Sequence, residues 1–517
     1  MDSCLSSKIL RSESEMPRTM RVKPVSCVNN SFSGNLLSGL ILRGKPTTSH
    51  QMVGIQNSFD GKKRTMKIAL RCIALFWMAG LCAVGANAGE GQPIAIVHAR
   101  LIDGMGGSPV ENAAVVVRGK TIEYAGPANV VSVPKDAQVI DATGKTVMPG
   151  LADLHVHLQG SWDGISVDLL GYQRYLKAML YAGVTTLMDT GNYQPWVLQL
   201  RQEQAAGRLQ GPRIYCVGAM IDSADPAWPD LAYAVTSRYQ IPEIVRRDKA
   251  AKVDMIKGYS NLSEHMLHWL SEEAGKEGIR VVIDQWERNG SPDLVATGIS
   301  GFAHLPTRKM NEEDIQFAKE HNIFFITTLT VTEAFARTRL NDIGFLKEPY
   351  IADTTPPWFL TELTEFANKP QTEPEKKETQ ESIVAHQEAM RNVKKLHDAG
   401  FLIATGTDAP YPGVFQGEGL HHELELMVEA GWKPLEAIRA STYDAARLMK
   451  AENEWGTLQA GRRATLLIIA GNPAERISDT RKIETVIQDG KIVDRTALKY
   501  DTKTDAGYRA VPGLFNP

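Results

Sequence analysis

Cysteine is scarce in this sequence: five of its 517 residues are cysteines. Cys4, Cys27, Cys72 and Cys82 lie before residue 89, and Cys216 alone follows. A mature chain that begins near residue 89, as argued below, therefore has no internal disulfide, even in an oxidising compartment. Cys216 lies in an apolar, strand-like run, which favours a buried structural thiol over a nucleophile.

The sequence also lacks an apolar run long enough to span a bilayer. The run from Cys72 to Gly85 has about 14 residues, fewer than the roughly 20 of a membrane span. A positively charged start at Met66 and an Ala-Asn-Ala site ending at Ala88 give it the form of an export signal. We expect residues 66–88 to be a signal peptide that is removed near Ala88, so that the mature protein reaches a bacterial periplasm or the cell exterior. Residues 1–65 are then an over-extension upstream of the true start, and their composition predicts disorder.

Beyond residue 88 the chain has no surplus of positive charge. Residues 1–88 carry 12 Lys and Arg against 4 Asp and Glu, and the remainder carries 45 against 56, a net charge of −11. A body this acidic is a poor binder of nucleic acid, which requires phosphate neutralisation. Neither a Gly-rich phosphate-binding fingerprint nor a serine nucleophile elbow stands out. These observations favour a globular protein that acts on a small molecule.

Short strand-like runs occur at both ends of the expected mature chain. Residues 94–97 and 464–469 are both apolar and rich in Ile, Val or Leu. Strands at both ends, around a long middle of alternating pattern, predict one small domain made from both termini. We interpret it as a β-sandwich built from residues 89–150 and 451–517, the latter including a C-terminal tail.

The middle, residues 151–450, alternates apolar strands with helical patterns, which is typical of a parallel sheet with crossover helices. Helices are expected over 263–276, 311–321 and 381–399. Eight β/α units in one run favour a closed (β/α)₈ TIM barrel over an open sheet. The eight expected strands end near His157, Asp189, Ala219, Gly258, Asp284, His304, Leu329 and Asp408.

The stretch between the seventh and eighth expected strands is unusually long. Two interpretations of residues 330–366 stay open: a lid over the barrel mouth, or a surface excursion without function. Residues 369–381 are rich in Pro, Glu and Lys, and we interpret them as a solvated tether for this excursion.

Chemically active side chains stand where the expected strands end, which is where a barrel enzyme places its catalytic groups. His155 and His157 are two residues apart, so a strand points both imidazoles to one face. An apolar strand has little reason to carry such a pair unless the pair binds metal. Later strands end on further metal ligands or proton carriers: Lys257, Asp284, His304 and Asp408. The pattern predicts a divalent metal centre.

Several longer motifs, taken in order, resemble those of the amidohydrolase superfamily. They are Met-Pro-Gly-Leu-x-Asp-x-His-x-His ending at His157, Gly183-Val184-Thr185-Thr186, Gly211-Pro212-Arg213, Gly406-Thr407-Asp408, and a terminal Gly-Asn-Pro followed by Asp-Gly-Lys-Ile-Val-Asp-Arg. The likeness runs from about Ile94 to Arg495 and is nearest the branch of Xaa-Pro dipeptidases and imidazolonepropionases. It implies a TIM barrel that holds one or two divalent ions, zinc above all.

The resemblance also implies a role for each residue of the centre. His155 and His157 take the more buried metal, and His304 takes a second, more exposed one. Asp408 binds metal and shuttles the proton, since a carboxylate beside activated water can accept a proton and pass it to the leaving group. Lys257 corresponds to a lysine that some members carboxylate to bridge two metals; a plain lysine in a salt bridge is the alternative.

Asp284 is the departure from the family pattern, which ends the fifth strand with a histidine ligand. A carboxylate can also bind zinc, so the second site can persist with an altered charge. Three interpretations stay open. Asp284 is a ligand, it is a bystander paired with another group, or a single ion lies among His155, His157 and Asp408 beside an uncarboxylated Lys257.

Three further residues are candidates for binding substrate. Tyr259 and Arg308 closely follow the fourth and sixth strand ends, where either would hold a substrate carboxylate; arginine does so bidentately. His421 opens the helix that follows the eighth strand, close to the expected barrel mouth.

Together these features predict an amidohydrolase that cleaves a carbon–nitrogen bond with metal-activated water. The expected partner is a small-molecule amide or peptide: a dipeptide, an N-acyl amino acid or a cyclic amide. Two alternatives stay open, namely deamination of a small heterocycle and a binding protein that has lost turnover, which Asp284 would support. The mature form is expected to have no stable membrane span, and the oligomeric state, a homo-oligomer included, is left open.

Overall fold

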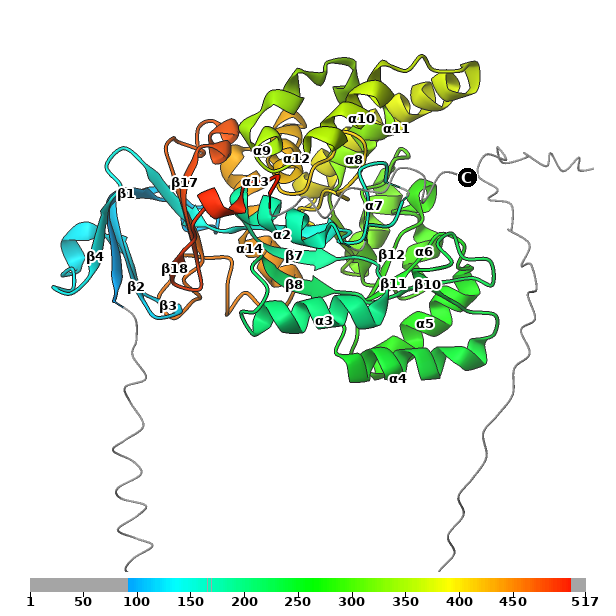
Figure 1. The fold of residues 1–517 in the computed structure, drawn as a ribbon. Coiled ribbons are helices and arrows are strands. Elements are labelled where there is room, and N and C mark those ends of the chain that lie inside the picture. Colours follow the sequence, from blue (N-terminus) through cyan, green and yellow to red (C-terminus); the bar gives the residue numbers. More distant parts are fainter. Residues whose placement is uncertain (1–91, 165, 169, 504–517) are drawn as a thin grey trace, which may run out of the picture. The chain divides into compact units, whose positions relative to one another are not determined.

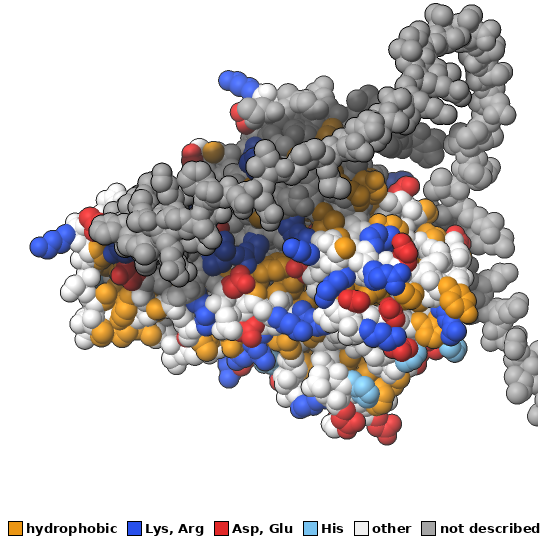
Figure 2. Space-filling view, turned by 90° about the horizontal axis from the view of Figure 1, so that it is seen from below, with side chains coloured by type: hydrophobic (Ala, Val, Ile, Leu, Met, Phe, Trp, Pro, Cys, Tyr) orange, Lys and Arg blue, Asp and Glu red, His pale blue; other side chains and the backbone are white. Residues whose placement is uncertain are grey.

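The computed structural model describes residues 92–503, except residues 165 and 169 (Figure 1). The over-extension expected over residues 1–65 and the signal peptide expected over residues 66–88 fall outside this part of the chain. Within it, none of the helices combines the length and the apolar character that crossing a membrane requires. In the view of Figure 2, acidic and basic side chains are interspersed over the described surface.

Strands from both ends of the described chain pair in one eight-stranded sheet, with the order β18-β17-β16-β5-β1-β2-β3 and with β4 on β1 (Figure 1). The strands are β1 (Ile94–Leu101), β2 (Val110–Arg118), β3 (Thr121–Pro127), β4 (Gln138–Asp141), β5 (Thr146–Pro149), β16 (Leu466–Ile469), β17 (Ile483–Gln488) and β18 (Lys491–Ile492). Val147 on β5 pairs with Leu101 on one side and Ile468 on the other. The two ends therefore share a sheet, while its folding into a two-layer sandwich stays a prediction.

The middle of the chain contains parallel strands in two sheets, β6-β7-β8 and β10-β9-β11-β12-β13-β14-β15. They are β6 (Leu151–Val156), β7 (Val184–Asp189), β8 (Arg213–Cys216), β9 (Met220–Asp222), β10 (Ala232–Ala234), β11 (Ile256–Gly258), β12 (Val281–Ile283), β13 (Gly301–Phe302), β14 (Phe324–Ile326) and β15 (Ile403–Ala404). A strand is present at each of the eight expected places. β9 and β10 are additional, because three-residue strands are too short to show a period in the sequence.

Backbone hydrogen bonds connect these sheets at two places. Asp254 donates its N–H to the carbonyl of Cys216, 2.9 Å away, which links the approach to β11 with the end of β8. Leu154 on β6 donates to the carbonyl of Thr405, just after β15, also at 2.9 Å. A parallel bridge between Val156 and Ala409 continues this second contact. The first and last parallel strands of the middle therefore lie side by side.

Helices alternate with these strands, and Figure 1 shows α3, α4 and α5 along their outside. The helices up to the seventh strand are α2 (Tyr172–Tyr181), α3 (Gln194–Ala205), α4 (Ile241–Ala251), α5 (Glu264–Lys276), α6 (Pro292–Val295) and α7 (Glu312–Glu320). Two of the expected helices begin where the sequence supplies a cap. The Ser263 side chain accepts from the N–H of Met266 at the start of α5, and Asn311 accepts from Asp314 at the start of α7.

The excursion between the seventh and eighth strands is helical. It contains α8 (Leu329–Phe335), α9 (Pro349–Ala352), α10 (Pro357–Asn368) and α11 (Glu373–Asp398). The interpretation of residues 369–381 as a tether was wrong, because Thr372 and Glu375 form a capping box that starts α11 at Glu373. The excursion also has an apolar core of its own, with Leu346, Ile351 and Leu363 among its buried residues. After the eighth strand come α12 (Glu418–Glu429), α13 (Pro434–Ala440) and α14 (Tyr443–Leu448).

The interior of the parallel strands is filled by apolar side chains that alternate with outward-facing ones. Leu154, Met188, Val282 and Ile326 belong to one buried cluster contributed by several strands. Cys216, at the end of β8, is a buried free thiol, and burial raises its pKa to about 12. This confirms the expected buried structural thiol. Because this packed core lies beneath the strand ends, polar side chains at those ends are held on a rigid base.

Candidate metal centre

The polar residues expected at the strand ends converge at the carboxyl edge of the parallel strands. His155 lies on β6 and Lys257 on β11, and His157 and Asp284 follow directly after β6 and β12. His304 lies two residues beyond the end of β13, and Asp408 lies four residues beyond the end of β15. Parallel strands present their carboxyl ends at one edge, so six residues from five strands reach a common point. Two groups of ligand atoms result, one of His155, Asp284 and His304 and one of His155, His157 and Asp408. Within each group these atoms lie within 4.8 Å of one another.

His155 belongs to both groups and is fully buried. Its Nε2 lies 3.5 Å from Oδ1 of Asp408, and Nε2 of His157 lies 3.2 Å from the same oxygen. In the other group, Nε2 of His304 lies 3.0 Å from Oδ2 of Asp284. The centre is therefore continuous, because His155 belongs to both groups. The group with Asp284 and His304 is the buried one, and the group with His157 and Asp408 is partly exposed, which is the reverse of the expected order of burial.

Lys257 completes the centre from β11. Its side chain is fully buried, and its Nζ lies 3.0 Å from Oδ2 of Asp284 and 3.4 Å from Nε2 of His155. A lysine amine buried without a partner would be very unfavourable, so this pairing accounts for its place in the protein interior. The same position is within reach of both ligand groups, as a bridging carbamate would have to be.

The electrostatics of the centre favour a neutral imidazole at His155 and ionised carboxylates at Asp284 and Asp408. Burial, reinforced by the charge of Lys257, holds the pKa of His155 well below its ordinary value. Burial alone would raise the pKa of Asp284, but His304 and Lys257 outweigh it and hold that pKa low. The pKa of Asp408 is also lowered, because its hydrogen bond to His157 and the neighbouring cationic groups outweigh burial. Metals bind these deprotonated forms.

Hydrogen bonds behind the centre orient the histidines. Nδ1 of His155 donates to the carbonyl of Ala303 at 2.8 Å, and Nδ1 of His157 donates to the carbonyl of Gly191 at 3.2 Å. A carbonyl accepts only, so each ring carries its proton on Nδ1 and turns a lone pair on Nε2 toward the centre. This is the arrangement that an imidazole needs to ligate a metal.

Two glycines of the sequence motifs allow β6 and β15 to approach their neighbours. A Cβ on Gly150, just before β6, would lie 2.2 Å from Oγ1 of Thr185. A Cβ on Gly406 would lie 2.7 Å from the Cβ of His155. Both positions therefore require glycine for His155 and Asp408 to be brought together.

Asp153 is a buried residue of the first motif whose role sequence reasoning missed. Its Oδ2 accepts from Oγ1 of Thr407 at 2.7 Å, and its Oδ1 accepts from the Thr407 N–H at 3.1 Å. Burial raises the pKa of Asp153 to about 8. Because Thr407 precedes Asp408, this carboxyl group fixes the backbone from which Asp408 projects. The position of Asp153 in the Met-Pro-Gly-Leu-x-Asp-x-His-x-His motif was the sequence signal that could have identified this role.

The residues present fit a divalent metal. Oδ1 of Asp284 is buried and has no hydrogen-bond partner among the described residues, so one acceptor at the centre is left open. Imidazole nitrogens with carboxylate oxygens are the ligands that zinc and similar ions take in catalytic sites. The donors and the open acceptor therefore suit an ion.

A chamber of about 250 Å³ lies beside the centre and is lined by His157, Asp408 and Tyr259. Sequence reasoning predicted those three but missed its aromatic walls: Trp228, Trp286, Phe335 and Tyr411. The Tyr259 hydroxyl accepts from Nε1 of Trp228 at 3.1 Å, and burial raises the pKa of Tyr259 well above its ordinary value. Tyr259 therefore stays a protonated phenol that can donate to a ligand in the chamber.

The other two candidates for substrate binding point elsewhere. The Arg308 guanidinium donates to Oδ2 of Asp314 and to the carbonyl of Gly290, each at 2.9 Å, so it braces the start of α7. His421 is fully buried and uses both ring nitrogens, on Oγ1 of Thr480 and the carbonyl of Ala182, each at 2.9 Å. The structure gives both residues packing roles and does not place either in the chamber. The number of residues between a side chain and the end of a strand does not determine the direction in which that side chain points.

Comparison with known proteins assigns the family. Residues 146–493 match the model of the amidohydrolase family. This is more than half of the chain, so the chain belongs to that family, whose enzymes are hydrolases of carbon–nitrogen bonds and generally bind divalent metal.

Individual relatives are similar at low identity. Ochratoxinase of Aspergillus niger is 24% identical over 460 residues, covering 77% of this chain and 86% of that protein. Adenine deaminase 2 of Rhizobium etli is 26% identical over 428 residues, covering 80% of this chain and 59% of that protein. A solved Xaa-Pro dipeptidase with bound methionine superposes with a TM-score of 0.63 at 21% identity, covering 78% of this chain and 99% of that one. The last comparison shows a shared fold.

Proposed function

We propose that this chain cleaves an amide bond of a small molecule with metal-activated water. The observation that carries the proposal is the shared His155, which joins two ligand groups into one centre beside an aromatic chamber. We further infer that β6, β7, β8, β11, β12, β13, β14 and β15 close into a TIM barrel, a closure that the Leu154–Thr405 and Asp254–Cys216 hydrogen bonds support.

The protein's own groups have separate tasks in this reaction. When bound, a divalent metal, which we propose to be zinc, supplies Lewis acidity toward the amide carbonyl and lowers the pKa of water. His155, His157, His304 and Asp284 would hold one or two such ions, with Lys257 between them. The Asp408 carboxylate, ionised and on the chamber wall, accepts the proton of the attacking water and returns it to the leaving nitrogen. Tyr259 donates a hydrogen bond to a substrate oxygen.

The proposed substrates are dipeptides, N-acyl amino acids and cyclic amides. The names of two similar proteins, ochratoxinase and Xaa-Pro dipeptidase, support an amide or peptide substrate. A second candidate function is deamination of a heterocycle, which the similarity to adenine deaminase 2 favours. The aromatic walls of the chamber suit a planar group in either case.

A substrate panel separates these functions. Chelator-treated protein and zinc-reloaded protein are assayed on dipeptides, N-acyl amino acids, cyclic amides and purines. Zinc-dependent release of a free carboxylic acid and an amine supports the proposed hydrolase. Release of ammonia without a free acid identifies a deaminase instead. Bound metal without turnover of any compound identifies a binding protein and contradicts the proposal.

A further inference from the structure

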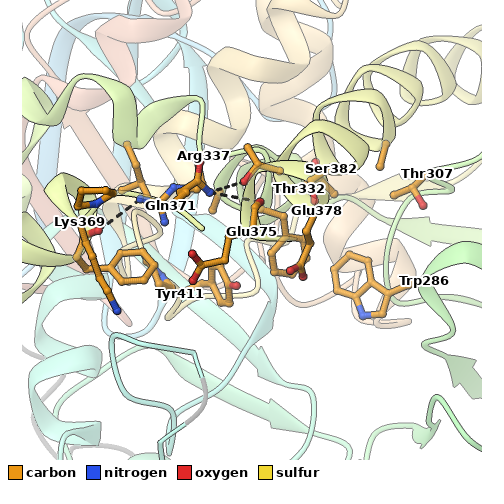
Figure 3. Close-up of a pocket in the computed structure, with 18 residues that line it drawn as sticks. Trp286, Thr307, Thr332, Arg337, Lys369, Gln371, Glu375, Glu378, Ser382 and Tyr411 are labelled. Atoms are coloured by element: carbon orange, nitrogen blue, oxygen red, sulfur yellow. Dashed lines mark hydrogen bonds between the residues drawn. The ribbon is translucent and has the colours of Figure 1, made fainter. Parts of the chain in front are cut away.

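A second, larger chamber of about 560 Å³ adjoins the one beside the metal centre (Figure 3). The two chambers share three wall residues, Trp286, Phe335 and Tyr411. The remaining wall comes largely from the helical excursion, namely from the end of α8 and the start of α11. A ligand at the metal centre that extends past the shared aromatic residues therefore enters this outer chamber.

The shared aromatic residues form a connected boundary that starts at the metal centre. Trp286 stacks on His304, with ring centroids 3.9 Å apart. Phe335 packs edge-on against Trp286 at 5.2 Å and against Tyr411 at 4.8 Å. The inner face of this boundary suits the apolar body of a substrate, whereas the outer chamber beyond it carries charged side chains.

Arg337 is a cation of the outer chamber that has no carboxylate within ion-pair distance among the described residues. It occupies the position after the C-cap of α8 with φ of 54°, a left-handed conformation that usually favours glycine. Its Nη2 donates to the carbonyls of Phe366 and Ala367, both at 3.4 Å, and its guanidinium lies 4.7 Å from the Phe366 ring. Across residues 92–503, without the two undescribed positions, no acidic side chain forms an ion pair with it. The half-buried cation is held in place while its other donors stay available.

The remaining charges of the chamber favour an anion at the Arg337 end. Figure 3 shows Lys369, also unpaired among the described residues, at that end of the chamber, and Trp286 at the other. The Glu375 carboxylate accepts from the N–H and hydroxyl of Thr372 at the start of α11, and after these bonds Lys369 and Arg337 also lower its pKa, so it lies in the field of both cations. Burial raises the pKa of Tyr411, and the negative charge of Glu378 raises it further. Glu378 therefore lies on the side of the chamber that faces the shared boundary. An anionic group therefore meets the negative charge of Glu378 near Tyr411, whereas at the other end the two cations Arg337 and Lys369 outnumber the one carboxylate of Glu375.

We propose that the outer chamber is a substrate subsite for a carboxylate, with Arg337 as the residue that recognises it. This rests on the proposed amide hydrolysis and narrows its substrate class. The substrate is an elongated amide: its scissile bond lies at the metal centre, an aromatic or apolar body passes Trp286 and Phe335, and a free carboxylate reaches Arg337. N-acyl dipeptides and tripeptides cleaved at their first amide bond have this form, because at least one residue separates that bond from the free carboxylate. An N-acyl amino acid, whose carboxylate is attached to the carbon next to the scissile nitrogen, does not have it, and neither does a bare heterocycle.

The test compares an N-acyl dipeptide with its uncharged C-terminal carboxamide, on zinc-loaded protein, and follows hydrolysis of the first amide bond. In wild type, kcat/KM for the carboxylate should exceed that for the carboxamide. Arg337→Met should lower kcat/KM for the carboxylate by about 10- to 100-fold, the loss expected for one charged hydrogen-bonded pair. The kcat/KM of the same variant for the carboxamide should stay within about twofold of the wild-type value, which would show that the active site is intact. Arg337→Lys should recover part of the loss, and Lys377→Met, an exposed change on α11 outside the chamber, should cause none.

Calorimetry measures binding without hydrolysis, so the carboxylate subsite can be tested even if the proposed amide hydrolysis fails. If neither compound is hydrolysed, binding of both to the zinc-loaded protein is measured, and tighter binding of the carboxylate that Arg337→Met abolishes still supports the subsite. Equal affinity for the two compounds, including no measurable binding of either, overturns it. An equal loss of kcat/KM for both compounds in Arg337→Met also overturns it, because that result indicates a structural role for Arg337.

Discussion

Asp284 is the residue that sets the charge of the centre. Its Oδ2 lies 3.0 Å from both Nζ of Lys257 and Nε2 of His304, and its Oδ1 has no hydrogen-bond partner among the described residues. Where the family pattern places a neutral imidazole, this side chain supplies an anion. An anionic ligand weakens the Lewis acidity of a metal and raises the pKa of water at the centre.

We expect Asp284→His to move the acidic limb of the pH–kcat/KM profile to lower pH than in wild type. The physical reason is that a neutral ligand leaves more positive charge on the metal, which acidifies water more strongly. The variant should also hold the second metal at least as well. The profiles are measured on zinc-loaded protein, with metal per chain determined on the same samples.

Asp284→Ala is the matched control for the three interpretations of this residue. Two metals in wild type and fewer in the alanine variant support ligation by Asp284. Two metals in both, with unchanged pH profiles, identify a bystander. One metal in both identifies a single-ion centre.

At the same residue scale, the six polar residues of the centre could be predicted because each lies in or shortly after the end of an apolar strand, and parallel strands bring such positions to one edge. The aromatic walls could not, because Trp228, Trp286, Phe335 and Tyr411 come from segments that follow strands and show no period. Arg308 was misassigned because its guanidinium is used by Asp314, a contact that only the fold creates.

At the scale of elements, α12 is held against the helical excursion by buried charge. Nε2 of His422 lies 2.6 Å from Oε2 of Glu333 on α8, and its Nδ1 lies 3.6 Å from Oε2 of Glu425. Arg339 and Arg481 both pair with the buried Glu418 at the start of α12. Burial alone would lower the pKa of His422, but its hydrogen bonds to the two glutamates outweigh it and raise the pKa to about 9.

This histidine predicts a pH dependence of stability. Its folded pKa of about 9 lies above the ordinary value of 6.5. The stabilisation is therefore fully present below pH 6.5 and is lost as the pH rises through about 9. Urea unfolding of wild type between pH 6 and pH 9.5 should show a fall in the free energy of unfolding of up to about 3 kcal/mol. The His422→Gln variant should be less stable than wild type at pH 6, and its free energy of unfolding should change less between pH 6 and pH 9.5. The same change with pH in the variant and in wild type would contradict the prediction.

The helices of this region also show where sequence patterns are ambiguous. A run of Glu and Lys over residues 369–381 resembles a solvated tether, yet the Thr372 cap and charge pairs such as Lys376–Glu373 at 2.7 Å make most of it a helix. The helices over 263–276 and 311–321 were predicted correctly because each has a clear helical period. In a charge-rich segment without an apolar period, tertiary contacts decide whether a helix forms, and the sequence pattern does not show them.

At the scale of the whole molecule, β5 joins the two ends of the described chain and leads directly into β6. Val147 pairs with both Leu101 and Ile468, and the N–H of Gly150 donates to the carbonyl of Thr465 at 3.2 Å. The shared sheet therefore anchors the strand that carries His155. That both termini pair could be predicted from their strand patterns, whereas the order of strands in the sheet could not, because it depends on long-range pairing.

We propose that the chain is exported and that its mature N-terminus lies at or near Gly89. The charged start at Met66, the apolar run and the Ala-Asn-Ala site motivate this proposal. N-terminal sequencing of protein recovered from a bacterial periplasm should begin within a few residues of Gly89. An Ala88→Leu variant should retain the signal, because a bulky residue blocks cleavage. Wild-type protein that still carries residues 66–88 would refute the proposal.

The central claim is that His155 and His157 hold a metal on which amide hydrolysis depends. The most direct measurement titrates zinc into chelator-treated protein and follows metal per chain and the rate on an amide substrate in the same samples. For wild type, the rate should rise in proportion to bound zinc and saturate at one or two ions per chain. The His155→Ala, His157→Ala double variant should keep its circular dichroism spectrum and show neither bound zinc at this centre nor hydrolysis. Activity within tenfold of wild type in that variant, with no metal bound, would contradict the account.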